Sequence, residues 1–409
     1  MAATDAGAAE ASQPHHRAPG DAGADRDDAV PRTTAAASGA RRGPDAATLL
    51  AAALALPGVM PAAALAQTAP DQGIVAMRYF DYRDWQPGAE RMNVHSPSLY
   101  LLKPLSDSLS FEGSVVYDAM SGASPLYHNT LSGASGVGIT EYRTAGDARI
   151  TKYYDRFAVG GGVAYSSERD YLSRAWSVDL RTWTADKNRT WAFGVGGARD
   201  NINPVNGITQ GRHRETYDLL VGVTQNINAN AVVQSNVTYT DGRGYYDDPY
   251  KPFDRRPDTR RVWAWLTRYN QYVPSADATL RLSYRLLLDS WGANSSTIDA
   301  EWVQALPHGF TVTPGLRYIT QQHADFYRDP PLGNGLRPGQ PYTADTRLSA
   351  FGAFTPSVRL GKQFADGWSA DIAMSVYRQK SSWHLGGEGS PGLLEFSARW
   401  FELGVQKTF

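Results

Sequence analysis

The sequence predicts an all-β fold, a transmembrane antiparallel up-and-down β-barrel of about sixteen strands with short periplasmic turns and long extracellular loops. Three observations support this prediction. Apolar and polar residues alternate along many segments, as in strands with one apolar face. Short and long connections alternate between these segments. The chain also ends in an alternating strand that closes on an aromatic residue, Phe409.

The composition narrows the class of protein. The 409 residues include no cysteine, which excludes disulfides, a cysteine-linked lipid anchor and thiolate metal sites. A mean hydropathy of −0.42 excludes a bundle of transmembrane helices. The net charge of −1 does not indicate the basic surface that nucleic-acid binding requires, so we expect no nucleic-acid partner.

The N-terminal part predicts export. Residues 1–40 are rich in Ala, Asp and Arg without periodicity, which is typical of disorder. Residues 41–66 resemble a signal peptide, with an Arg pair, an apolar run from Leu49 to Leu56 and a cleavage motif that ends at Ala66. Because a signal peptide belongs at the start of a chain, we expect translation to begin downstream of Met1. Residues 67–409 then form a single barrel domain.

The strands are predicted from period-2 alternation. Leu282, Tyr284 and Leu286, for example, alternate with Ser283 and Arg285. Segments of this kind are expected near 74–85, 92–103, 108–120, 139–153, 156–168, 171–185, 190–200, 213–226, 229–241, 261–272, 277–289, 296–306, 309–322, 347–363, 367–380 and 395–409.

The connections distinguish a membrane barrel from other all-β folds. Those after even-numbered strands are short, whereas most of those after odd-numbered strands are longer, with the tight Arg169-Asp170 connection as an exception. A secreted β-sandwich, propeller or solenoid is the alternative, but it gives no reason for this asymmetry, and no repeat of about 40 residues is present. Aromatic residues next to the short turns resemble an interfacial girdle: Phe157, Trp191, Tyr272, Phe310, Trp368 and Phe409.

The last strand resembles a biogenesis signal. Phe401, Leu403, Val405 and Phe409 share one face of this strand, as in the signal that the barrel assembly machinery reads. Lys407 departs from the usual apolar residue. We expect an outer-membrane protein of a Gram-negative bacterium, with membrane lipid and this machinery as partners.

Three motifs resemble a known family. They are Tyr117-Asp118-Ala119-Met120-Ser121-Gly122-Ala123-Ser124-Pro125, then Glu141-Tyr142-Arg143, then Ser166-Ser167-Glu168-Arg169-Asp170-Tyr171-Leu172-Ser173. In this order they are similar to the domain-of-unknown-function 3570 (DUF3570) family of Gram-negative outer-membrane β-barrel proteins. The resemblance covers essentially the whole mature chain. It implies a fold and a location, and it allows a role beside periplasmic lipoprotein or redox partners.

The polar faces of the strands predict a charged lumen. The expected inward residues include both signs, and Arg281 and Arg285 precede the strand of Asp299 and Glu301, so that opposite charges can pair across strands. Such a wall either selects ions and solutes or consists of solvated residues that satisfy one another. The candidates are Glu112, Asp118, Asp179, Arg181, Asp218, Arg281, Arg285, Asp299, Glu301, Arg317 and Asp371.

Two strands carry small residues on the expected inner face. Gly160 and Gly162 lie on one, and Gly194 and Gly196 on the other, although glycine weakens a strand. Either this stripe leaves space for a solute, a partner or an inserted loop such as Ser121–Gly138, or Trp183 and Arg181 fill the gap.

No catalytic set is predicted, and the protein is expected not to be an enzyme and to need no cofactor or metal. Five His residues near one rim (His95, His128, His213, His323 and His384) lack ligand spacing, and Asp247, Asp248 and Asp254 do not match a calcium loop. Trp263 and Trp265 could stack sugars or face lipid.

The expected function is therefore porin-like passage or gating of small solutes or ions. The alternative is a plugged barrel that acts as a scaffold or conduit for periplasmic lipoprotein or redox partners. A rim-site enzyme is a minor alternative.

Overall fold

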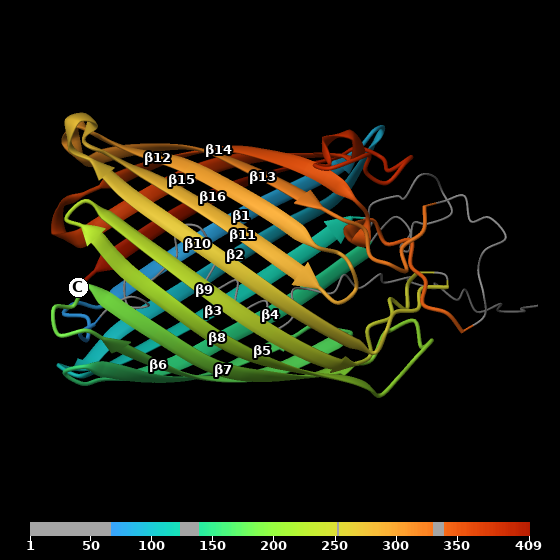
Figure 1. Cartoon of the computed structure of the whole chain (residues 1–409), viewed down its shortest axis with the longest axis horizontal. Helices are drawn as coiled ribbons and strands as arrows, with labels where there is room; N and C mark the ends of the chain where they lie inside the picture. Colours follow the sequence, from blue (N-terminus) through green and yellow to red (C-terminus); the bar gives the residue numbers. More distant parts are fainter. Residues whose placement is uncertain (1–66, 123–138, 252, 330–338) are drawn as a thin grey trace, which may run out of the picture. The chain divides into compact units, whose positions relative to one another are not determined.

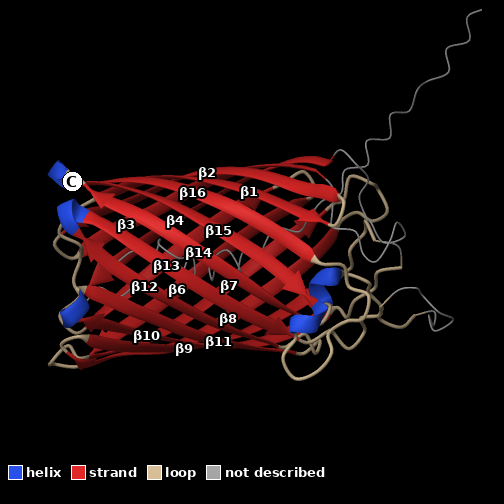
Figure 2. Cartoon of the chain, turned by 90° about the horizontal axis from the view of Figure 1, so that it is seen from above, coloured by secondary structure: helices blue, strands red, loops and turns tan. Residues whose placement is uncertain are grey.

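Sixteen antiparallel strands form a closed barrel in the computed structural model (Figure 1, Figure 2), which describes residues 67–122, 139–251, 253–329 and 339–409. Each strand pairs with its neighbours in sequence, and β1 (Ile74–Gln86) pairs with β16 (Phe396–Thr408) to close the ring. The predicted all-β class, the barrel and the number of strands are confirmed. The segments 1–40 and 41–66 lie outside the described residues.

The other strands follow in order around the ring. They are β2 (Ala89–Ser106), β3 (Leu109–Gly122), β4 (Ile139–Tyr153), β5 (Phe157–Ser167), β6 (Tyr171–Trp183), β7 (Arg189–Ile202), β8 (Arg212–Asn228), β9 (Ala231–Gly244), β10 (Thr259–Val273), β11 (Ala278–Asp289), β12 (Ser295–Leu306), β13 (Phe310–Gln321), β14 (Phe351–Gln363) and β15 (Trp368–Lys380).

Helical structure in the described part of the chain is limited to short 3₁₀ turns, and none of it is long and apolar enough to cross a membrane. These turns are η2 (Pro274–Ala276), η3 (Pro307–Gly309), η4 (Thr346–Leu348), η5 (Ala365–Gly367) and η6 (Ser381–Trp383). Two of these turns, η3 and η5, need a glycine because of their backbone conformation. His308 and Gly309 have φ of 63° and 75°, and Asp366 and Gly367 have 57° and 74°, so both residues of each pair adopt the left-handed conformation of tight hairpins.

The two faces of the barrel differ in chemistry. On the outer face, large apolar side chains such as Met77 and Trp263 are 64% and 52% exposed. On the inner face, alternate residues of the same strands are polar or charged and more buried, for example Arg78 beside Met77. This alternation follows from the period of two residues in a pleated strand, and it is the arrangement of outer-membrane barrels.

The two ends of the barrel differ in their connections (Figure 2). At the end where β16 finishes, short turns such as Asp107–Ser108 and Ala229–Asn230 join the strands. We call this the turn end. At the opposite end, which we call the loop end, connections such as 245–258 and 381–395 are longer. Two connections there are as tight as those of the turn end: Pro87–Gly88 and Glu168–Asp170.

Some predicted strand boundaries differ from the observed ones. The strand expected at 92–103 is longer, because β2 runs from Ala89 and pairs with β1 beyond a register shift at Arg83/Trp85. The strand expected at 347–363 starts only at Phe351. The Asp345 side chain accepts a hydrogen bond from the Arg347 backbone N–H, which caps η4 and delays the strand.

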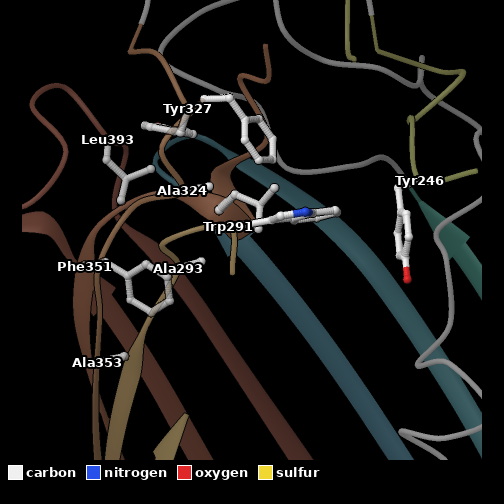
Figure 3. Close-up of a cluster of buried hydrophobic side chains, with 10 residues drawn as sticks. Tyr246, Trp291, Ala293, Ala324, Tyr327, Phe351, Ala353 and Leu393 are labelled. Carbon is white, nitrogen blue, oxygen red and sulfur yellow. The ribbon is translucent and has the colours of Figure 1, made fainter. Parts of the chain in front are cut away.

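Among the described residues, the largest cluster of buried apolar side chains lies at the loop end of the barrel (Figure 3). Trp291, from the β11–β12 connection, packs edge-on against Tyr246 and Phe326 with ring centroids 5.2 and 5.3 Å apart. Leu348 comes from the same β13–β14 connection as Phe326, and Leu393 comes from the β15–β16 connection. The cluster therefore binds four described loops to one another.

Candidate functional site: the charged inner wall

The inner wall carries charged side chains on opposite sides of the ring. β4 and β12 are eight positions apart in either direction around the sixteen strands, so they face one another across the lumen. Carboxyl groups dominate near β4, and guanidinium groups dominate near β12. We call these regions the acidic wall and the basic wall. Their members are, respectively, Glu112, Asp118, Glu141, Asp147, Glu168 and Asp179 with Arg143, Arg149 and Arg181, and Arg268, Arg281, Arg285 and Arg317 with Asp299 and Glu301.

The acidic wall contains an ion pair that spans two strands. Arg149 of β4 pairs with Asp179 of β6, above Gly160 of the intervening strand β5. A Cβ atom at Gly160 would collide with the Arg149 guanidinium and the Asp179 carboxylate. Arg181 lies 3.6 Å from the other Asp179 oxygen. Glycine at position 160 therefore provides the space in which the charges meet.

The other small residues of the predicted stripe also lie against neighbouring groups. At Gly162 a Cβ atom would be 3.1 Å from the Ser177 Oγ, and at Gly194 it would be 3.4 Å from the Leu220 Cβ. At Gly196 it would be 3.2 Å from a backbone oxygen. Trp183 packs with Ala69, Tyr153 and Ala158 near the turn end. The predicted plug, Ser121–Gly138, falls almost entirely outside the described residues.

The three family-like motifs converge at the loop end of the acidic wall. The Arg143 Nε donates to Asp118 over 2.6 Å and lies 4.0 Å from the Glu168 Oε1. Asp118 also accepts from the Ser96 hydroxyl. In the adjacent β5–β6 connection, Asp170 accepts from the Tyr250 hydroxyl and, over 3.2 Å, from the Val205 N–H. The motifs thus join β3, β4 and the β5–β6 connection to the β7–β8 and β9–β10 connections.

The Glu168 carboxyl group has fewer hydrogen bonds than its buried position calls for. Its side chain is 2% exposed, and its Oε2 has no hydrogen-bond partner within the described residues. Burial, together with the nearby Glu141 carboxylate, raises the pKa of Glu168 to about 8. The Glu168 carboxyl therefore holds a proton at neutral pH, so that less negative charge accumulates beside Asp118 and Glu141.

The basic wall has more cations than carboxylates. Arg317 donates to Asp299 over 2.5 Å, and Arg281 lies 3.6 Å from Glu301. Arg285 is opposite Thr297 rather than a carboxylate. Arg268 donates to Gln234 over 3.4 Å. This side of the lumen therefore keeps net positive charge.

A third group of charges, which we call the ladder, links β14, β15, β16 and β1, where the ring closes. Arg359 of β14 donates to Asp371 and, over 2.6 Å, to Glu402 of β16, while Arg78 of β1 lies 3.3 Å from Asp371. The remaining candidate, Asp218, accepts from the Thr240 hydroxyl over 2.5 Å. The charges of this ladder balance, so it contributes less to the field across the lumen than the two walls do.

Several of these residues were missed in the sequence. Glu141, Arg143, Asp147 and Arg149 have the opposite parity to the exposed Tyr142 and Ile150, so the alternation of β4 alone marks them as inward. Their partners could not be found in this way, because the Arg149–Asp179 contact depends on the register of three strands.

The predicted rim residues have ordinary partners. His95 lies 3.0 Å from Asp81, and the Asp247 and Asp254 carboxylates accept hydrogen bonds from Arg256. Among the residues that the structure describes, no three His, Asp or Glu side chains converge as metal ligands. Trp263 and Trp265 lie on the outer face, each 52% exposed.

Comparisons with known proteins complete the description. None of the curated proteins matches this chain. Among solved structures it is similar to the siderophore receptor PirA from Pseudomonas aeruginosa, at 10% identity and a TM-score of 0.42, over 83% of this chain and 80% of that one. It is also similar to CdiB from Acinetobacter baumannii, at 10% identity and a TM-score of 0.49, over 81% of this chain and 60% of that one.

The family comparison covers most of the chain. The family described as "Protein of unknown function (DUF3570)" matches residues 46–213 and 207–400, which include all three motifs. This outer-membrane-type β-barrel therefore belongs to the DUF3570 family.

Proposed function

We propose that the chain is a channel in the outer membrane of a Gram-negative bacterium, through which small charged solutes or ions pass between two oppositely charged walls. The observation that carries this proposal is the placement of the acidic and basic walls on opposite sides of one closed ring. Opposed charges create a field across a lumen, and this field orients a solute and favours one sign of ion.

The dimensions and surfaces of the barrel support the same proposal. A ring of about sixteen strands is wide enough to hold water when nothing fills it. The outer face carries apolar side chains, for example Leu219 and Ile372, which are 54% and 51% exposed and suit hydrocarbon. A hollow of about 610 Å³ at the turn end is lined mostly by amides and small residues, including Asn226, Asn230 and Asn270, and it suits a hydrated entrance.

The alternative is a closed barrel that serves as a scaffold or conduit for a periplasmic lipoprotein or redox partner. The four loops that meet around Trp291 favour it, since an ordered loop cluster narrows one end. The first proposal involves the passage of solutes and the second the binding of a partner, and neither assigns the protein a catalytic activity.

Single-channel recording separates the two proposals. The refolded protein, verified by heat-modifiable migration, is inserted into a planar bilayer in KCl. Steady ohmic steps support the channel. A correctly folded but silent barrel overturns it, and co-purification of a lipoprotein or redox protein from envelope membranes then tests the scaffold.

A further inference from the structure

An outward-facing pocket at the loop end has the chemistry of an anion site. It is a hollow of about 250 Å³ lined by Leu172, Arg174, Arg199, Asn201 and His213 of β6, β7 and β8. These residues have the same parity as the exposed Trp176, Val195 and Tyr217, so they lie on the outside of the barrel.

Two arginines oppose one another in this pocket. Arg174 and Arg199 are direct partners in the β6–β7 register, a placement that is destabilising for like charges. Within the described part of the chain, Arg174 has neither a hydrogen bond nor an ion pair. The Arg199 side chain is 68% exposed, and its nearest carboxylate, Glu215, lies 3.8 Å away. A shared phosphate would turn this repulsion into charge-assisted hydrogen bonds.

The neighbouring groups are suited to the same anion. The His213 Nδ1 lies 3.0 Å from the Asn201 Oδ1, which fixes the amide and leaves its NH₂ group as a donor. Further along the same rim, Arg243 and Arg261 also face outward, 2.8 and 3.7 Å from Asp241. Basic side chains thus continue beyond the pocket, which suits a ligand with more than one negative group.

The outer surface between the pocket and the turn end indicates that the ligand is a lipid rather than a free anion. The Trp176 indole lies over Gly197, next to the register position of Tyr217, and aromatic residues of this kind mark the headgroup level of a membrane. Below them the outer faces of β6, β7 and β8 are apolar and exposed, with Val178, Val195, Leu219 and Val221 among their residues. Acyl chains can therefore continue from a headgroup held in the pocket.

We propose that this pocket binds a phosphate of the phosphorylated glycolipid in the outer leaflet, with Arg174 and Arg199 as paired donors. The assignment to the outer leaflet rests on the proposed outer-membrane location, since the short turns of such barrels face the periplasm. The lipid packs against the outside of the barrel and takes no part in passage through the lumen.

The experiment measures lipid binding by native mass spectrometry of the detergent-solubilised full barrel. The probes are bis-phosphorylated lipid A, lipid A without phosphates, phosphatidylglycerol and inorganic phosphate. We expect bis-phosphorylated lipid A to bind best, and we expect Arg174→Gln combined with Arg199→Gln to weaken its binding by about tenfold or more. The matched control is Arg189→Gln, which removes an outward arginine of β7 at the turn end, where it bonds Gln225 over 2.7 Å.

Each result distinguishes one source of the anion. Equal binding of lipid A without phosphates, or unchanged binding by the double variant, overturns the site. Equal binding of phosphatidylglycerol overturns the glycolipid assignment, and displacement of lipid A by inorganic phosphate at similar concentration overturns the lipid assignment.

In lipid-free detergent, Arg174→Gln should leave the unfolding midpoint unchanged or raise it, because it removes a repulsion. Conductance of the double variant should equal that of the wild type, so a silent barrel would overturn the channel without affecting this proposal.

Discussion

Arg149 and Asp179 form an ion pair across a strand to which neither belongs, because the intervening Gly160 has no side chain in their way. Both side chains are about one quarter exposed, at 27% and 21%. Glycine weakens a strand, but a larger residue at this position would push apart two charges on the inner wall.

This relationship predicts the effect of one methyl group. Gly160→Ala should lower the free energy of unfolding by about 1–3 kcal/mol, the usual range for overpacking. The measurement is urea unfolding of the refolded protein in lipid vesicles. The control is Gly161→Ala on the same strand, where a Cβ atom meets nothing within 4 Å. Equal stability of the two variants would show that the ion pair tolerates the methyl group.

The basic wall predicts the ion preference of the channel. Replacement of Arg281 and Arg285 by Gln should shift the permeability ratio toward cations by about two- to fivefold, since two charges a few ångströms from an ion's path contribute ~0.4–1 kcal/mol in water. The reversal potential in a KCl gradient measures this shift. It should shrink at high salt, because screening weakens the field. Arg189→Gln, on the outer face, should leave the ratio unchanged, and an equal shift in that variant would argue against a role for the lumen wall.

Glu168 predicts a pH dependence of stability. Its pKa of about 8 in the folded barrel lies above the usual value near 4.5, so the folded state holds this proton more tightly than the unfolded state does. This contribution to stability should therefore fall as pH rises from about 4.5 to about 8, by at most ~1.4 kcal/mol per pH unit. Glu168→Gln should flatten the profile of unfolding free energy against pH, whereas Glu388→Gln, at an exposed loop position, should not. An unchanged profile in Glu168→Gln would mean that other groups set it.

Asp345 predicts how firmly the loops are held together. It is buried, lies 2.9 Å from Arg256 and also pairs with Arg347. Burial on its own would raise the pKa of Asp345, but the charges of Arg347, Lys251 and Arg256 hold this pKa well below the usual range. Asp345→Asn should cost about 3–5 kcal/mol, the usual effect of breaking a buried pair, and should expose the loops to protease. Stability from this carboxylate is present above its unfolded pKa and is lost as pH falls through the lower folded value.

Limited proteolysis of barrels in vesicles tests this prediction. Cleavage in the loops near residues 245–258 and 339–350 should become faster in Asp345→Asn. The control is Asp258→Asn, an exposed residue of one of these loops. If both variants resist protease as the wild type does, the Trp291 cluster alone holds the loops.

The fold could be predicted from the sequence more completely than the site. Alternation along each strand and aromatic residues beside short turns can each be recognised within one segment of the sequence. Together they indicate the number of strands and the closure of the strands into a barrel. The partner of Asp179 could not be predicted, because it lies on β4 and is reached only over β5. The outer pocket was missed for a different reason. The alternation predicts an apolar outer face throughout, whereas Arg174 lies on the same outward face as Trp176, two residues nearer the loop end.

The C-terminal residue provides the last prediction. Phe409 exchanges backbone hydrogen bonds of 2.8 and 2.9 Å with Gly73, its ring lies over the place where a Gly73 side chain would be, and it is 56% exposed on the barrel surface. Phe409→Ala keeps both backbone bonds, so refolding in detergent should still give a closed barrel. If the aromatic end is read during assembly, the same variant should accumulate poorly in the outer membrane of cells. Phe364→Ala, at a 54% exposed residue of the same end, should accumulate normally. Comparing heat-modifiable protein in envelope fractions with refolding yield separates recognition from stability, since a stability defect would lower both and a recognition defect only the first.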